Sequence, residues 1–301
     1  MKRVLFCAAL VLSVMTAYSQ KTAEDFFKNS LDKKDFKEQL IYLNKAIELK
    51  ADYLEAFFAR GKAKSELKDF QGAIKDFTKV IELKADHSDA YHFRGLAKNE
   101  IKDFEGAIKD FNKAIDLNPD NAEAYYKRGN PKSNMKDYIG AIEDFNRAIQ
   151  LKPDYAKAYF NRGLVKGRLQ DYEGSIKDYT KAIQLNPDYV DGYLNRGVIK
   201  SKMLDYKGAI DDFNTVIGIQ SNNSQAYYNR ACAKFKLQDD KGSSEDNTKA
   251  IELNPDFAEA YYNRGLSRYI LGEKEAACTD LKKAGKLGFD QANLIIAEYC
   301  K

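Results

Sequence analysis

Apolar residues recur along this chain at helical spacing, in short runs that alternate with turns. In residues 54–87, Leu54, Phe57 and Leu67 fall on one face of a first helix. A second run has apolar residues three and four positions apart: Ala73, Ile74, Phe77, Val80 and Ile81. The segment 68–72 (KDFQG) lies between the two runs and supplies a turn. The pattern therefore predicts two amphipathic helices joined by a short turn.

This helix-turn-helix unit recurs every 34 residues almost to the C-terminus. Its clearest marker is an arginine at one position of successive units: Arg60, Arg94, Arg128, Arg162, Arg196, Arg230 and Arg264. An aromatic residue stands three positions before each arginine: Phe57, Tyr91, Tyr125, Tyr159, Tyr193, Tyr227 and Tyr261. Glycine follows every arginine except Arg230, and proline ends four units, at Pro119, Pro153, Pro187 and Pro255. Seven matches in unbroken register indicate an internal repeat.

The period and the order of aromatic residue, glycine, Ala-x-x-x-Phe and terminal proline resemble the tetratricopeptide repeat. The resemblance implies an all-α fold, a right-handed α-solenoid (superhelix) of stacked helix-turn-helix repeats. Residues 54–291 are expected to form seven consecutive units. Residues 20–53 are expected to be a divergent N-terminal repeat, because Phe26-Phe27 stands where Arg-Gly should be. Residues 292–301 are expected to form a C-terminal capping helix.

The first nineteen residues differ from the rest of the chain. Lys2 and Arg3 precede an apolar run over residues 4–14, and Ala17-Tyr18-Ser19 has small residues at the two positions that a signal peptidase reads. The run is too short for a transmembrane helix, which needs about 18 apolar residues. A signal peptide over residues 1–19 is predicted, with export to a bacterial periplasm or to the outside of the cell.

The charge balance gives no reason to expect a nucleic acid partner. Loss of Lys2 and Arg3 with the signal peptide leaves 47 basic residues against 45 acidic ones. No later apolar run approaches the length of a membrane span. The mature chain is therefore expected to bind neither nucleic acid nor membrane by insertion.

Charged residues follow the same period as the arginines. Sixteen residues after each arginine comes an aspartate: Asp76, Asp110, Asp144, Asp178, Asp212, Asp246 and Asp280. The aspartate of a typical unit, such as Asp110, lies between small residues and should face a neighbouring helix. We therefore predict Arg–Asp pairs within the array, bidentate where geometry allows.

Two units depart from the pattern. Pro131 falls inside a first helix, where a kink or an early helix end is expected. The unit 224–257 has Ala231 for glycine, Ser243 for alanine and Asn247 for the aromatic residue, so its packing is expected to be the loosest.

Enzyme chemistry has no recognisable site in this sequence. The two histidines, His87 and His92, have no cysteine near them, so a zinc site is not expected. Phosphate loops, metalloprotease motifs and nucleophile elbows are absent. The sequence therefore predicts no catalytic residues, no metal and no cofactor.

Three cysteines remain after the signal peptide: Cys232, Cys278 and Cys300. Cys278 and Cys300 lie eleven residues before and after Phe289, in the turn between two predicted helices. Antiparallel helices would bring them side by side, so a disulfide is predicted in an oxidising compartment.

The family resemblance implies that the first helices line the concave side and hold an extended peptide. Carried onto this chain, the two positions after each first-helix aromatic residue give the candidate groove: Phe58, His92, Tyr126, Phe160, Asn161, Asn195, Tyr228, Asn229, Tyr262 and Asn263. The asparagines form a ladder of amides that can donate to and accept from a peptide backbone. A second interpretation remains open, in which Tyr-Tyr-Asn-Arg is the ordinary composition of such repeats.

The sequence favours a non-enzymatic scaffold that binds a peptide or a partner protein. One alternative is a cell-envelope assembly factor or a glycan-associated accessory factor, and a further one is a hydrolase with an unrecognised site. The partner and the oligomeric state are not predicted by these patterns.

Overall fold

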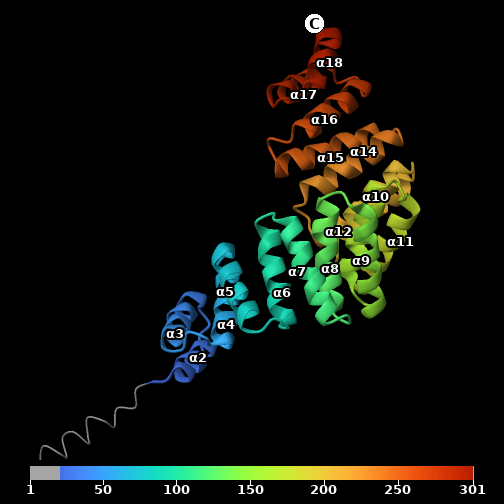
Figure 1. Cartoon of the computed structure of the whole chain (residues 1–301). Coiled ribbons are helices and arrows are strands. Elements are labelled where there is room, and N and C mark those ends of the chain that lie inside the picture. Colours follow the sequence, from blue (N-terminus) through green and yellow to red (C-terminus); the bar gives the residue numbers. More distant parts are fainter. Residues whose placement is uncertain (1–20, 301) are drawn as a thin grey trace, which may run out of the picture. The chain divides into compact units, whose positions relative to one another are not determined.

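The structure, a computed structural model, describes residues 21–300, and the predicted signal peptide over residues 1–19 lies outside them. The described residues form helices α2 to α18 and no strand, which confirms the all-α fold of stacked helix pairs (Figure 1). None of these helices combines the length and apolar character needed to cross a membrane.

The chain divides into two compact units, residues up to Asp137 and residues from Tyr138. The first unit contains α2 (Ala23–Leu31), α3 (Phe36–Leu49), α4 (Leu54–Glu66), α5 (Phe70–Leu83), α6 (Ser88–Glu100), α7 (Phe104–Leu117) and α8 (Ala122–Asn134). The second contains α9 (Tyr138–Leu151), α10 (Ala156–Arg168), α11 (Tyr172–Leu185), α12 (Val190–Lys202), α13 (Tyr206–Ile219), α14 (Ser224–Lys236), α15 (Asp240–Leu253), α16 (Ala258–Ile270), α17 (Lys274–Lys286) and α18 (Gln291–Tyr299). Within each unit, consecutive helices pack against one another.

An aspartate caps most second helices. In α5, Asp69 precedes the first residue, and its Oδ1 accepts a hydrogen bond of 2.9 Å from the main-chain nitrogen of Gly72. A Cβ on Gly72 would lie 2.1 Å from the Asp69 carboxylate, so a larger residue there would require the Asp69 side chain to shift. The same pairing caps α7, α11, α13 and α15. These five repeats therefore carry their own signal for where the second helix begins.

The glycine after the arginine allows the two helices of a repeat to approach closely. A Cβ on Gly61 would lie 2.7 Å from the ring of Phe77, and a Cβ on Gly197 would lie 2.7 Å from Phe213. The rings of Phe77 and Phe213 are almost fully buried at these contacts. The glycine of the first helix and the aromatic ring of the second therefore pack directly against each other.

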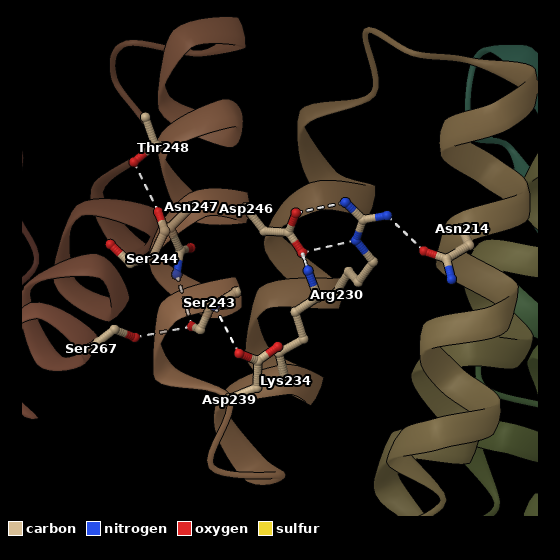
Figure 2. A network of polar contacts seen from close by, with 11 residues as sticks. Asn214, Arg230, Lys234, Asp239, Ser243, Ser244, Asp246, Asn247, Thr248 and Ser267 are labelled. Carbon is tan, nitrogen blue, oxygen red and sulfur yellow. Dashed lines mark hydrogen bonds and ion pairs between the residues drawn. The ribbon is translucent and has the colours of Figure 1, made fainter. Parts of the chain in front are cut away.

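The predicted Arg–Asp pairs are confirmed in six repeats of the described residues. In the repeat that starts with α14, Arg230 Nε and Nη2 donate to the two oxygens of Asp246 at 2.8 and 2.6 Å. Lys234 Nζ lies 2.8 Å from the same carboxylate, and Figure 2 shows Asp246 held between the two cations. The equivalent aspartates are Asp76, Asp110, Asp178, Asp212 and Asp280. Each is buried against one bidentate and one monodentate cation.

The arginine also joins its repeat to the preceding one. Arg230 Nη1 donates to Asn214 Oδ1 on α13 at 2.6 Å, and Arg196 Nη1 donates to Thr180 Oγ1 on α11 at 3.0 Å. Asparagine or threonine occupies this position in each such contact. The guanidinium group therefore connects three helices, which sequence analysis did not predict.

Pro131 does not shorten its helix, contrary to one of the two expectations. Helix α8 runs from Ala122 to Asn134, so it has the same length as α10 or α12. The proline lies near the C-terminal end, where it removes one hydrogen bond, and its ring is buried at the position that Ala97 fills in α6. The helix therefore continues past the proline with the ring buried.

The repeat formed by α14 and α15 is not loosened, although its core is polar. Its helices pack as closely as those of other repeats. Ala231 stands where other repeats have glycine, and Asn247 stands where five of them have an aromatic ring and the last has Leu281. The added methyl group and the smaller side chain compensate each other. Asn247 is fully buried, its Nδ2 lies 3.5 Å from Ser243 Oγ, and Ser267 Oγ donates to Ser243 Oγ at 3.0 Å (Figure 2).

The C-terminal helix α18 packs against α17 and is held by a disulfide. Cys278 on α17 and Cys300 after α18 are bonded, with a Cα–Cα distance of 5.6 Å. This is the pair that the spacing around Phe289 indicated. Cys232 is the free cysteine of the described residues.

We expect Asp178→Ala to lower the free energy of unfolding by about 3 kcal/mol, because it leaves Arg162 and Lys166 without their buried anion. Arg162→Ala should lower the free energy of unfolding by less, because Lys166 still neutralises Asp178. Urea unfolding would measure both. Lys177→Ala, on the exposed face of α11, is the control and should change stability by less than about 0.5 kcal/mol. Equal losses of stability for Asp178→Ala and Lys177→Ala would show that the buried ion cluster does not stabilise the fold.

Removal of the disulfide should release α18 selectively. The bond closes a loop of 22 residues, for which the chain-entropy estimate is about 3 kcal/mol. In the Cys278→Ser/Cys300→Ser variant, hydrogen exchange of residues 291–299 should accelerate while exchange in α16 is unchanged. Mass spectrometry of the oxidised wild-type protein should find only Cys232 open to alkylation. Unchanged protection of α18 in the variant would show that packing alone holds this helix.

Candidate functional site

The first helices of successive repeats form one face in each unit. In the first unit α4 contacts α6 and α6 contacts α8, and in the second unit α10, α12, α14 and α16 contact one another in turn. We call the exposed surface of these helices the first-helix face. The candidate groove residues lie on these helices, and all of them except the buried His92 are partly exposed on this face.

A hollow of about 290 Å³ opens on the first-helix face between α12 and α14. It is lined by Val198, Ser201, Lys202, Tyr206, Phe213, Asn229, Cys232, Ala233 and Lys236. Only Asn229 among these was predicted from the sequence. Six of the others come from the second half of α12 or α14, and Tyr206 and Phe213 come from α13.

The same hollow occurs four repeats earlier in the first unit, between α4 and α6. It is lined by Lys62, Ser65, Glu66, Phe70, Phe93, Leu96, Ala97 and Glu100, each 136 residues before its counterpart. Its volume is only about 120 Å³. Phe93 stands where the other hollow has Asn229, and Leu96 stands where it has Cys232, so larger side chains fill the space.

A larger hollow of about 610 Å³ lies between α2 and α4. Phe58, one of the candidate groove residues, lines it together with Phe27 and Leu31. Helix α2 has nine residues and is shorter than α4, which has thirteen.

The aromatic residues of the candidate groove contribute mainly to contacts between repeats. Each packs against a ring that precedes the next first helix, with centroids 4.8 to 5.1 Å apart. The pairs are Phe58 with His87, Phe160 with Tyr189, Tyr228 with Phe257, and Tyr262 with Phe289. Tyr126 is likewise half-buried on α8. These rings therefore offer a ligand only part of their surface.

His92 is not available to a ligand, contrary to the prediction. Its side chain is 6% exposed and packs edge-on against Phe93 and Phe111, with centroids 5.5 and 5.7 Å away. Burial lowers the pKa of His92, and the neighbouring Lys127 lowers it further, whereas Glu123 and Asp89 oppose the shift. Its Nδ1 is buried without a hydrogen-bond partner. The imidazole is thus held neutral in an aromatic cluster.

The asparagines remain accessible on the first-helix face. Asn195 Nδ2 donates to the main-chain oxygen of Asp191 at 2.8 Å, and Asn229 Oδ1 accepts from Gln225 Nε2 at 3.0 Å. Each of these amides therefore keeps its second polar group free of any described side chain. Asn161 is half-buried at the equivalent position of α10.

Asn263 differs because its amide nitrogen donates to Cys232 Sγ at 3.2 Å. Burial raises the pKa of the Cys232 thiol, and it also raises the pKa of the neighbouring Tyr228. Both groups are therefore neutral near pH 7. This cluster connects α14 to α16 and is a structural contact.

Among residues 21–300, no three His, Cys, Asp or Glu side chains are arranged so that they could hold one metal ion. The acidic groups that lie deepest are the aspartates already paired with arginine.

Comparison with known families gives consistent matches. Family models described as "Tetratricopeptide repeat" match residues 54–87, 156–189, 224–257 and 258–287, and a model described as "TPR repeat" matches residues 95–130 and 135–170. Together these matches cover more than half of the chain. No curated protein matches it.

Several solved structures are similar to this chain. The C-terminal part of a TPR repeat-containing protein from Cytophaga hutchinsonii has a TM-score of 0.65 at 18% identity, over 80% of this chain and 97% of that one. A tetratricopeptide repeat protein from Parabacteroides merdae has a TM-score of 0.60 at 18% identity, over 82% and 99%. YrrB, described as a TPR protein with an unusual peptide-binding site, has a TM-score of 0.52 at 20% identity, over 61% and 95%. These likenesses show the fold.

His92 should make stability depend on pH. The unfolded chain takes up a proton near the ordinary histidine pKa of 6.5, while the folded chain takes it up only at lower pH. The free energy of unfolding should therefore fall as pH drops below about 6.5. His92→Phe, which introduces the ring found at Phe58 and Phe160, should reduce this fall. Urea unfolding at about pH 7.5 and pH 5.5 would test it. Identical pH dependence in both proteins would exclude His92 as the source.

Proposed function

Because the chain belongs to the tetratricopeptide repeat family, we propose that it is a non-enzymatic scaffold that binds an extended segment of a partner protein along its first-helix face. The observation that carries this proposal is the pair of accessible amides, Asn195 and Asn229, at equivalent positions of α12 and α14. Helix α12 contacts α14, so the two amides belong to one continuous surface.

The chemistry of an amide suits a peptide backbone. Asn195 retains a carbonyl oxygen that can accept a hydrogen bond, and Asn229 retains an amino group that can donate two. A peptide backbone offers both a donor and an acceptor at every residue except proline. Binding through the backbone would tolerate varied side chains in the partner.

The contribution of the rings is smaller than the sequence suggested. Phe160 and Tyr228 are already packed against Tyr189 and Phe257. They would hold neighbouring repeats together and so keep the amides at a fixed separation, with limited direct contact to the peptide.

Export of the chain is part of the same proposal. Lys2, Arg3 and the apolar run over residues 4–14 support a signal peptide. The geometry of Cys278 and Cys300 is that of a disulfide, a bond that persists in oxidising compartments such as a periplasm or the cell exterior. The partner would then be a protein of the same compartment.

Selection of short random peptides on the protein, followed by affinity measurement, would test the proposal. The double variant Asn195→Ala/Asn229→Ala should bind the selected peptides about thirtyfold more weakly, if each hydrogen bond contributes about 1 kcal/mol. Lys177→Ala/Lys181→Ala on α11 is the control and should have no effect. Failure to select any peptide, or an equal loss of affinity in both double variants, would show that this face is not the binding surface.

A further inference from the structure

The two equivalent hollows of this chain carry opposite charges at their rims. The last residue of the first helix is Glu66 in α4 and Glu100 in α6, but Lys202 in α12 and Lys236 in α14. All four side chains are exposed and line their hollow. In the second unit the basic series extends to Arg168, the exposed last residue of α10.

The rim lysines are distinct from the structural ones. Lys200 and Lys234, two residues earlier, pair with the buried Asp212 and Asp246. Lys202 and Lys236 form no ion pair with any carboxylate of residues 21–300. The ammonium groups at the rim are therefore available to a charged partner, and those of Lys200 and Lys234 are not.

Helix stability accounts for the lysines at this position but not for the glutamates. The C-terminal end of a helix favours a cation and disfavours an anion. Glu66 and Glu100 occupy that end in the first unit against this preference, while lysine occupies it in the second. Helix stability therefore does not explain why the two hollows differ in the charge of their rims.

The floor of the basic hollow is apolar and has room for a side chain. Val198, Phe213 and Ala233 line it beneath Lys202 and Lys236, and its volume is about 290 Å³. Asn229, with its amino group unpaired, lies at the same opening. An apolar floor, an amide at the opening and cations on the rim fit a peptide with an apolar side chain flanked by carboxylates.

The geometry points to the hollow between α12 and α14 as the site that selects an acidic segment of the partner protein, with an apolar side chain between its carboxylates. This inference rests on the proposed peptide binding and adds the class of peptide. A nucleic acid fits less well. Its phosphates are closely spaced along the backbone, whereas this face presents one rim cation per repeat and an apolar floor.

The test uses three synthetic peptides of one length, in which leucine is flanked by glutamate, by glutamine or by lysine. The wild-type chain should bind the glutamate peptide at least tenfold more tightly than the glutamine peptide, and added salt should reduce the difference. Lys202→Glu/Lys236→Glu should abolish this preference and favour the lysine peptide. The matched control is Glu66→Lys/Glu100→Lys, which changes the same positions of the other hollow and should leave the preference unchanged.

The outcomes separate this inference from the proposed function. Equal affinity for the glutamate and glutamine peptides, with both weakened by Asn195→Ala/Asn229→Ala, would overturn the acidic selectivity and leave peptide binding intact. If the two charge-reversal variants change the preference for the glutamate peptide by equal and opposite amounts, the preference follows the overall charge of the protein. That result would overturn the assignment of the hollow between α12 and α14 as the selective site. Tighter binding of a single-stranded oligonucleotide than of the glutamate peptide, dependent on Lys202 and Lys236, would identify a nucleic acid site instead. Binding of none of the peptides would overturn both proposals.

Discussion

A buried aspartate that requires two cations is the constraint on which each repeat depends. Asp246 lies on a second helix, while Arg230 and Lys234 lie one turn apart on the first helix. A shift of one helix along the other would separate charges that have already lost most of their water. The ion cluster therefore fixes the register of the pair, while the close contact of glycine with an aromatic ring fixes its spacing. The third bond of the arginine, to Asn214, carries the same register into the neighbouring repeat.

The repeat, its helices and its Arg–Asp pairs could be predicted because each depends on residues that return at a constant interval. The inter-repeat bond of Arg196 could not, because its acceptor is threonine in one repeat and asparagine in another, and either oxygen serves. The extent of burial was also not predicted. His92 contacts Phe111 as Phe58 contacts Phe77 one repeat earlier. His92 is nevertheless 6% exposed whereas Phe58 is half-buried, a difference that the repeat pattern does not show.

The candidate site shows the same division. Equivalent positions identified the amides of Asn195 and Asn229, since a repeat places like residues on like surfaces. The hollow between α12 and α14 depends on the small size of Asn229 and Cys232 compared with Phe93 and Leu96. Its volume is a property of several side chains together, and a periodic pattern read one position at a time does not reveal it.

The matched pair of Ala231 and Asn247 bears on how such an array can be rebuilt by recombination. A crossover in the turn between α14 and α15 would combine Ala231 with an aromatic ring, or a glycine with Asn247. Ala231 with an aromatic ring would overfill the space between the two helices, and glycine with Asn247 would leave a void there. A crossover between repeats keeps the two residues together and disturbs neither. Whole repeats of this chain are therefore the units that can be gained, lost or exchanged, and the two helices of this repeat must be inherited as one.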